Sequence, residues 1–135
     1  MLGQQHKERR KHVQEEIASL LGPGLVHLSQ PLGTNHYLAT VDVSALDKDL
    51  KDTNTISIVY VEKSLVYEGF DADFGPLNLA CLYKFSNRVK KLLDRKKVVV
   101  HLTSNDARMR VNAAFLSGSF AVSIPLFAIK LSIKP

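Results

Sequence analysis

The first hydrophobic pattern along the chain has the period of a helix. Residues 4–21 are mostly charged or polar, and their large apolar side chains fall on one stripe: Val13, Ile17, Leu20 and Leu21. This spacing predicts an amphipathic helix. Gly22-Pro23-Gly24 predicts its end. The next segment, 25–33, has few periodic features, so we expect a connector there.

Three short segments rich in β-branched and aromatic residues predict strands. They are 36–41, 56–61 and 98–100. A further apolar run, 65–67, follows Glu62-Lys63 and indicates strand pairing through a tight turn. The polar segment 42–54 is expected to be a loop.

Two more helices are predicted by apolar residues at helical spacing. One extends from Pro76, which suits the first position of a helix, to about Asp94. Its buried face is expected to carry Leu79, Leu82, Phe85, Val89 and Leu92. The other begins near Asp106 and reaches about residue 123, because Pro125 should end or kink it. Strands that alternate with helices predict an α/β domain with a mixed, largely parallel sheet flanked by helices.

Length and composition narrow the class of protein. The chain has 135 residues, 45% of them hydrophobic and 23% charged, which fits one small globular domain. Its single cysteine, Cys81, excludes an internal disulfide framework, and no cysteine and histidine cluster has zinc spacing. We therefore predict no metal and no cofactor. A reducing, intracellular location, nuclear or cytoplasmic, is expected, since the charged start of the chain lacks the apolar region of a secretory signal.

The net charge of +5 would suit an acidic partner. The strongest basic patch lies at the end of the second predicted helix and beyond it: Arg88, Lys90, Lys91, Arg95, Lys96 and Lys97. It is either an ordinary solvated surface or a scaffold for acidic or phosphorylated partners. Nucleic acid is disfavoured as a partner, because no aromatic residues interleave with these charges.

The segment 111–129 carries no formal charge and is long enough to span a membrane. Polar residues interrupt it, including Asn112, Ser117 and Ser123, and Pro125 lies within it. A buried helix is therefore the favoured interpretation. A membrane-associated segment is the alternative.

The stretch 98–122 is predicted to form a strand, a turn and a helix. This arrangement can bind a phosphate, because the N-terminus of the helix points free backbone N–H groups at the turn. Cysteine-dependent phosphatases place His-Cys at the strand end, five loop residues, and then an arginine that clamps the phosphoryl oxygens. His101 and Arg108 keep this spacing, but Leu102 replaces the cysteine and has no ionisable proton. The expectation is a degenerate phosphate loop, without catalytic residues, in a chain that is not itself an enzyme.

Two further features argue against phosphate binding at this turn. The loop, 103–107, has no glycine, and Asp106 adds a carboxylate that repels a dianion. The alternative is structural, with Asn105 or Asp106 capping the N-terminus of the helix. A weaker catalytic alternative is Asp71-x-Asp73, whose spacing is similar to that of haloacid-dehalogenase-type phosphatases.

Two uncommon strings provide a family resemblance. They are ADFGPLNLA at 72–80, and Arg108 followed by Asn112-Ala113-Ala114-Phe115. Together with Tyr37-Leu38-Ala39-Thr40, they resemble the N-terminal, non-catalytic domain of the cell-division-cycle-fourteen family of dual-specificity protein phosphatases. The resemblance assigns structural roles to six motif residues: Asp73, Phe74, Gly75, Pro76, Asn78 and Asn112.

The resemblance implies a phosphatase-like fold in which two such domains sit in tandem and only the C-terminal one carries the nucleophile. The N-terminal domain would then support recognition of proline-directed phosphoserine substrates or make other protein contacts in cell-cycle dephosphorylation. Its expected partners are a phosphatase catalytic domain or a phosphoprotein.

The resemblance also divides the chain into three expected parts. Residues 1–35 form a charged helix and a connector, residues 36–122 form the phosphatase-like domain, and residues 123–135 form a divergent tail. No His-Cys-x5-Arg site follows. A domain truncated at its C-terminus is therefore one expectation for this chain.

Overall fold

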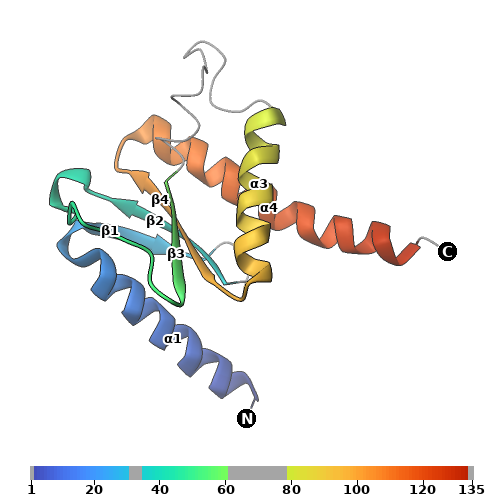
Figure 1. Ribbon diagram of the computed structural model, residues 1–135, viewed down its shortest axis with the longest axis horizontal. Helices are drawn as coiled ribbons and strands as arrows, with labels where there is room; N and C mark the ends of the chain where they lie inside the picture. The colour runs from blue at the N-terminus through green and yellow to red at the C-terminus, as the bar shows by residue number, and fades with distance from the viewer. Residues whose placement is uncertain (1, 31–34, 61–78, 134–135) are drawn as a thin grey trace.

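The computed structural model describes residues 2–30, 35–60 and 79–133. Its elements are, in chain order, α1 (Leu2–Leu21), the 3-10 turn η1 (Gly22–Gly24), β1 (Leu25–Ser29), β2 (His36–Val41), the 3-10 turn η2 (Val43–Ala45), β3 (Ile56–Tyr60), α3 (Leu79–Asp94), β4 (Val98–Ser104) and α4 (Ala107–Ile133). Figure 1 shows the sheet with α1 on one side and with α3 and α4 on the other.

The four strands lie in the order β1-β2-β4-β3. Strand β4 is parallel to both of its neighbours, β2 and β3, whereas β1 is antiparallel to β2. Strand β4 is an inner strand of the sheet. Its residues are almost all buried, as expected of a parallel strand that is covered on both faces. The predicted α/β class with a mixed, largely parallel sheet is confirmed.

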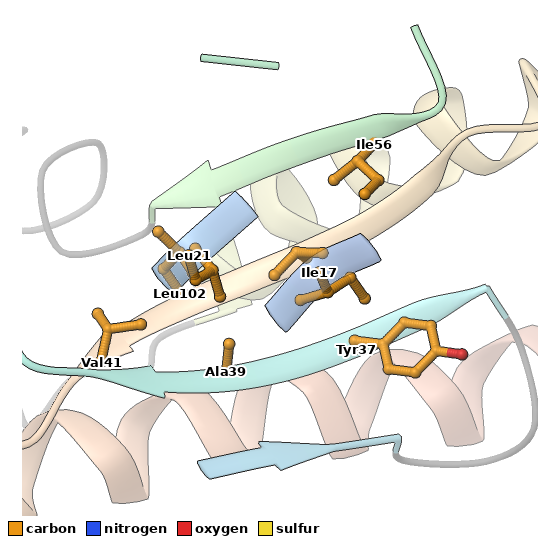
Figure 2. Packing of buried hydrophobic residues seen from close by; sticks show 8 residues of the cluster. Ile17, Leu21, Tyr37, Ala39, Val41, Ile56 and Leu102 are labelled. Atoms are coloured by element: carbon orange, nitrogen blue, oxygen red, sulfur yellow. The ribbon is translucent and has the colours of Figure 1, made fainter. Parts of the chain in front are cut away.

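Each face of the sheet carries its own hydrophobic core, since successive strand residues point to opposite faces. Between α1 and the sheet, the core is formed by Ile17, Leu21, Tyr37, Ala39, Val41, Ile56, Val100 and Leu102. Figure 2 shows the two helix residues, Ile17 and Leu21, above side chains of β2, β3 and β4. On the opposite face, α3, α4 and the sheet form a core from Val59, Cys81, Phe85, Val89, Val99, Leu116 and Phe120. The predicted stripe of the first helix is therefore the face that α1 buries.

The segment 25–33 is not simply a connector. Residues Leu25–Ser29 form β1, in which Leu28 pairs with Ala39 of β2, so the expectation was wrong for this part. Strand β1 lies at the end of the sheet and its side chains are only partly buried, which leaves no clear alternation of apolar and polar residues. Before it, Gly22 ends α1 with a φ of +59°, a conformation that glycine adopts easily.

Helix α3 ends in a Schellman motif. The N–H of Lys97 donates to the carbonyl oxygen of Leu92 at 3.1 Å, and the N–H of Lys96 donates to that of Leu93 at 2.9 Å. Lys96 occupies the left-handed position of this motif, with a φ of 59°. A side chain with a Cβ atom is strained in that conformation.

Two element ends differ from the sequence predictions. Strand β4 continues past residue 100 to Ser104, because residues 101–104 pair with residues 38–41 of β2. Helix α4 does not end near residue 123 but continues through Pro125 to Ile133. A proline removes only one backbone donor from a helix, so the turns on either side can continue.

Some expectations fall outside the described residues. They are the tight turn at 62–63, the run 65–67, the helix start at Pro76 and the Asp71-x-Asp73 pair. Within 2–30, 35–60 and 79–133, no helix combines the length and the apolarity that crossing a bilayer requires.

Candidate functional site

The junction between β4 and α4 is too short to form the expected five-residue phosphate loop. Thr103 and Ser104 belong to β4, where they pair with Thr40 and Val41 of β2. Only Asn105 and Asp106 separate the strand from the helix. The expectation of a loop over 103–107 is therefore wrong, because the sheet holds its first two residues.

The three residues of the degenerate phosphate loop are not brought together. Leu102 is 3% exposed. It lies in the core on the α1 side of the sheet, where Figure 2 shows it close to Leu21. His101, its neighbour in β4, faces the opposite side of the sheet and is fully buried. Arg108 is exposed on the first turn of α4. Their spacing in the sequence is that of a phosphatase loop, but their side chains surround no common point.

The turn instead contains a helix cap. The Asp106 carboxylate oxygen Oδ1 accepts the backbone N–H of Arg108 at 3.0 Å and that of Met109 at 3.1 Å. These N–H groups are among those that an anion at the helix N-terminus would need. The interpretation of Asp106 as an N-cap is thus confirmed.

A buried polar cluster, made of His36, Ser117 and His101, lies on the α4 side of the sheet. Ser117 Oγ of α4 is 2.7 Å from Nδ1 of His101 in β4 and 3.3 Å from Nε2 of His36 in β2. All three residues are at most 1% exposed. The rings of Phe85 and His101 have centroids 4.8 Å apart, and the Phe120 ring meets His36 edge-on at 5.6 Å. The cluster therefore connects α4 to β2 and β4, and phenylalanine rings pack against both of its histidines.

Burial controls the charge of both histidines. Loss of hydration lowers the pKa of His36 from its ordinary value to about 4. Loss of hydration, together with repulsion from His36, lowers the pKa of His101 to about 3. Both rings are neutral at pH 7. His101 Nε2 is buried and has no hydrogen-bond partner within the described residues.

A serine beside a histidine is also the arrangement of a nucleophile and its base. Ser117 is fully buried, however, so no substrate can reach its hydroxyl. The geometry supports a structural role in which one hydroxyl group is within hydrogen-bond distance of one nitrogen of each imidazole. Sequence reasoning missed this cluster. Its signal was a set of polar residues, His36, His101 and Ser117, within otherwise apolar segments.

The structure describes one of the six motif residues that the family resemblance singles out. Asn112 is half-buried on α4, whereas Asp73, Phe74, Gly75, Pro76 and Asn78 lie outside the described residues. The structural roles of these six motif residues therefore stay predictions. In the part of the chain that the structure describes, no three His, Cys, Asp or Glu residues are grouped to hold a metal ion.

The basic patch is largely open to solvent. Arg88, Lys90, Lys91, Arg95 and Lys96 are exposed. Lys97 is half-buried, and its Nζ donates a hydrogen bond to the carbonyl oxygen of Asn54. Five of the six cations thus face solvent around the end of α3, where a partner could reach them.

Comparison with known proteins gives one consistent result. A sequence model described as "Dual specificity protein phosphatase, N-terminal half" matches residues 35–131. The chain is 49% identical over 75 residues to the dual specificity protein phosphatase CDC14A of Mus musculus, an alignment that covers 51% of this chain and 12% of that one. It is 35% identical over 78 residues to the tyrosine-protein phosphatase CDC14 of Saccharomyces cerevisiae, which covers 55% and 14% of the two chains.

The human CDC14A phosphatase gives a similar result, with 45% identity over 76 residues, 53% of this chain and 13% of that protein. The chain therefore spans well under a fifth of the length of these relatives. The family match covers more than half of the chain and includes β2, β3, α3, β4 and most of α4. By this match, the chain belongs to the family of dual-specificity protein phosphatases, whose N-terminal half it represents.

Proposed function

We propose that this chain is the non-catalytic half of a dual-specificity protein phosphatase and acts through protein contacts in cell-cycle dephosphorylation. Its partner would be a phosphatase catalytic domain, whose substrate recognition it would support, in the nucleus or cytoplasm. The family match and the high identity to CDC14 phosphatases support this proposal.

The position of residue 102 supports a non-catalytic role. A cysteine nucleophile must be an accessible thiolate, which a positive environment stabilises. Residue 102 faces the apolar core beneath α1 and is 3% exposed. Such surroundings raise the pKa of a thiol and exclude a phosphate ester. The backbone, and not only the missing cysteine, therefore opposes catalysis at this position.

The observation that carries the proposal is an exposed apolar stripe on α4, made of Val111, Phe115 and Val122. These side chains are 67%, 51% and 56% exposed. Steps of four and seven residues place them on one face of the helix. Gly118 lies between them, and the space beside it is open. A continuous apolar surface of this kind marks a protein contact, and we assign it to the catalytic domain.

The test is binding between this chain and a phosphatase catalytic domain of the family, measured by calorimetry. Phe115→Asp should weaken binding by at least tenfold, because it places a charge in the centre of the stripe. Tyr83→Asp is the matched control, since Tyr83 is an aromatic residue of α3 that is 70% exposed. The control should weaken binding by less than about twofold. Equal losses in the two variants, or no binding by the unmodified chain, would refute the proposal.

A second candidate function rests on the exposed cations at the end of α3. A scaffold that binds acidic or phosphorylated partners through Arg88, Lys91 and Arg95 would lose affinity steeply as salt is added. Binding to a phosphoprotein at 50 and 300 mM salt tests this candidate. Affinity that does not change with salt would remove it.

A further inference from the structure

A cleft of about 400 Å³ lies between the sheet and the first turns of α4. Its floor comes from β1, β2 and β4, and its wall comes from α4 between Ala107 and Ala114. It is separate from the buried cluster of His36, Ser117 and His101, none of which lines it. Thr103 and Ala107 line it, whereas Asn105 and Asp106, which connect β4 to α4, do not.

The floor of the cleft contains one row of polar side chains. His27 of β1 pairs with Thr40 of β2, and Thr40 pairs with Thr103 of β4. Residues that are paired across strands point to the same face. His27 is exposed, whereas Thr40 is 7% and Thr103 is 1% exposed. The row thus descends from solvent at the sheet edge to the interior beneath α4.

Thr40 is the informative member of this row. Its side chain is 7% exposed and lines the cleft. A threonine hydroxyl can donate one hydrogen bond. A ligand oxygen in the cleft could accept this O–H.

The charge and polarity of the lining define the ligand. Arg110 lines the cleft from α4, and no lining residue is acidic. An arginine fork beside a hydroxyl donor suits an oxyanion. Leu38, Val111 and Ala114 add apolar surface around these donors. This apolar surface favours a peptide over an inorganic ion. Apolar residues next to the peptide's acidic side chain can be buried against the surface, whereas an inorganic ion has no apolar group.

We infer that this cleft binds the acidic side chain of a peptide, with Arg110 and Thr40 as the donors to its carboxylate or phosphate oxygens. Val111 belongs both to the cleft and to the apolar stripe of α4, so a partner on the stripe lies next to the cleft. The inference deepens the proposed function, because it names the chemistry of the peptide that this domain recognises. The cleft itself needs no catalytic domain.

The experiment uses the complete chain and three labelled ten-residue peptides, read by fluorescence polarisation at fixed salt. The peptides have leucines around one central residue, which is phosphoserine, glutamate or serine. One or both acidic peptides should bind, and the serine peptide should bind at least fivefold more weakly. Binding of the glutamate peptide indicates an unmodified acidic sequence, whereas binding of the phosphoserine peptide alone indicates a phosphorylated partner. Either result supports an oxyanion site.

Two variants test the donors. Arg110→Gln should weaken acidic-peptide binding at least fivefold. Arg108→Gln removes the same charge two residues away, at a position that does not line the cleft, and should weaken binding less than twofold. Thr40→Val keeps the side-chain volume and should weaken binding at least threefold without lowering the unfolding temperature. Equal effects of the two arginine variants, equal binding of the serine peptide, or no binding at all would overturn the inference. Because no catalytic domain is present, these results are independent of the α4 contact.

Discussion

His101 Nδ1 lies 2.7 Å from Ser117 Oγ, and this contact joins the central strand β4 to helix α4 inside the core. The same hydroxyl is 3.3 Å from Nε2 of His36. One serine therefore connects α4 to both β2 and β4. The cleft, the apolar stripe and the capped turn all depend on where α4 lies.

Ser117→Ala should destabilise the fold. It leaves both imidazoles buried without their shared partner, which costs about 2–3 kcal/mol. Urea unfolding at pH 7 measures the loss. Ser119→Ala, at a half-buried position of the same helix, is the control and should change stability by less than about 0.5 kcal/mol. Similar losses of unfolding free energy in the two variants would show that the hydrogen bonds of Ser117 do not stabilise the fold.

Stability should fall as the solution becomes acidic. The unfolded chain binds protons on His36 and His101 near pH 6.5, but burial lowers their folded pKa values to about 4 and about 3. The unfolded state therefore holds more protons between about pH 6.5 and 3, and stability decreases as the pH falls through this window. Between pH 7 and pH 5 the loss should be about 3–4 kcal/mol for the two groups.

The control for this pH dependence is an exposed histidine. Urea unfolding at pH 7, 6 and 5 should show a smaller slope for His36→Gln than for the unmodified chain. His27→Gln should leave the slope unchanged, because His27 is exposed. A flat profile in the unmodified chain would mean that the buried rings are not held neutral.

The N-cap of α4 should contribute measurably to stability. Asp106→Ala removes the acceptor of two backbone N–H groups and should cost about 1 kcal/mol. Asp106→Asn keeps a good capping residue and should cost only a few tenths of that. Thermal unfolding of the two variants makes the comparison. If Asp106→Asn lowered the stability by more than this amount, the negative charge of Asp106 would also stabilise the helix N-terminus.

Lys96→Gly should stabilise the chain by about 0.5–1 kcal/mol, because glycine adopts the left-handed conformation at the end of α3 without strain. Lys90→Gly is the matched control, since it makes the same change inside α3, where glycine should cost about 1 kcal/mol. The two changes in unfolding free energy should thus have opposite signs. A destabilising Lys96→Gly would show that the lysine side chain contributes more than its backbone strain costs.

Local patterns were sufficient for most of the elements. Strand β2 has the predicted limits, and the stripe that includes Ile17 and Leu21 is the buried face of α1. The edge strand β1 was missed because its pairing with β2 is a tertiary contact and its side chains are partly exposed. The continuation of α4 past Pro125 was missed for a similar reason, since one lost hydrogen bond does not decide where a long helix ends.

The candidate site was less predictable than the fold. The spacing of His101, Leu102 and Arg108 indicated a phosphatase-like turn, but spacing does not specify which face of a strand each side chain occupies. The pleat places His101 and Leu102 on opposite faces, and the register with β2 holds Thr103 in the sheet. The row of His27, Thr40 and Thr103 depends on the pairing of three strands that are distant in the sequence.

The most direct test of a non-catalytic role is aryl-phosphate hydrolysis by the unmodified chain and by Leu102→Cys, with and without vanadate. Residue 102 lies in the core at 3% exposure, so the new thiol should also resist labelling until urea is added. Neither protein should show turnover above a buffer blank. Vanadate-sensitive turnover by either one would mean that the chain can catalyse phosphate hydrolysis.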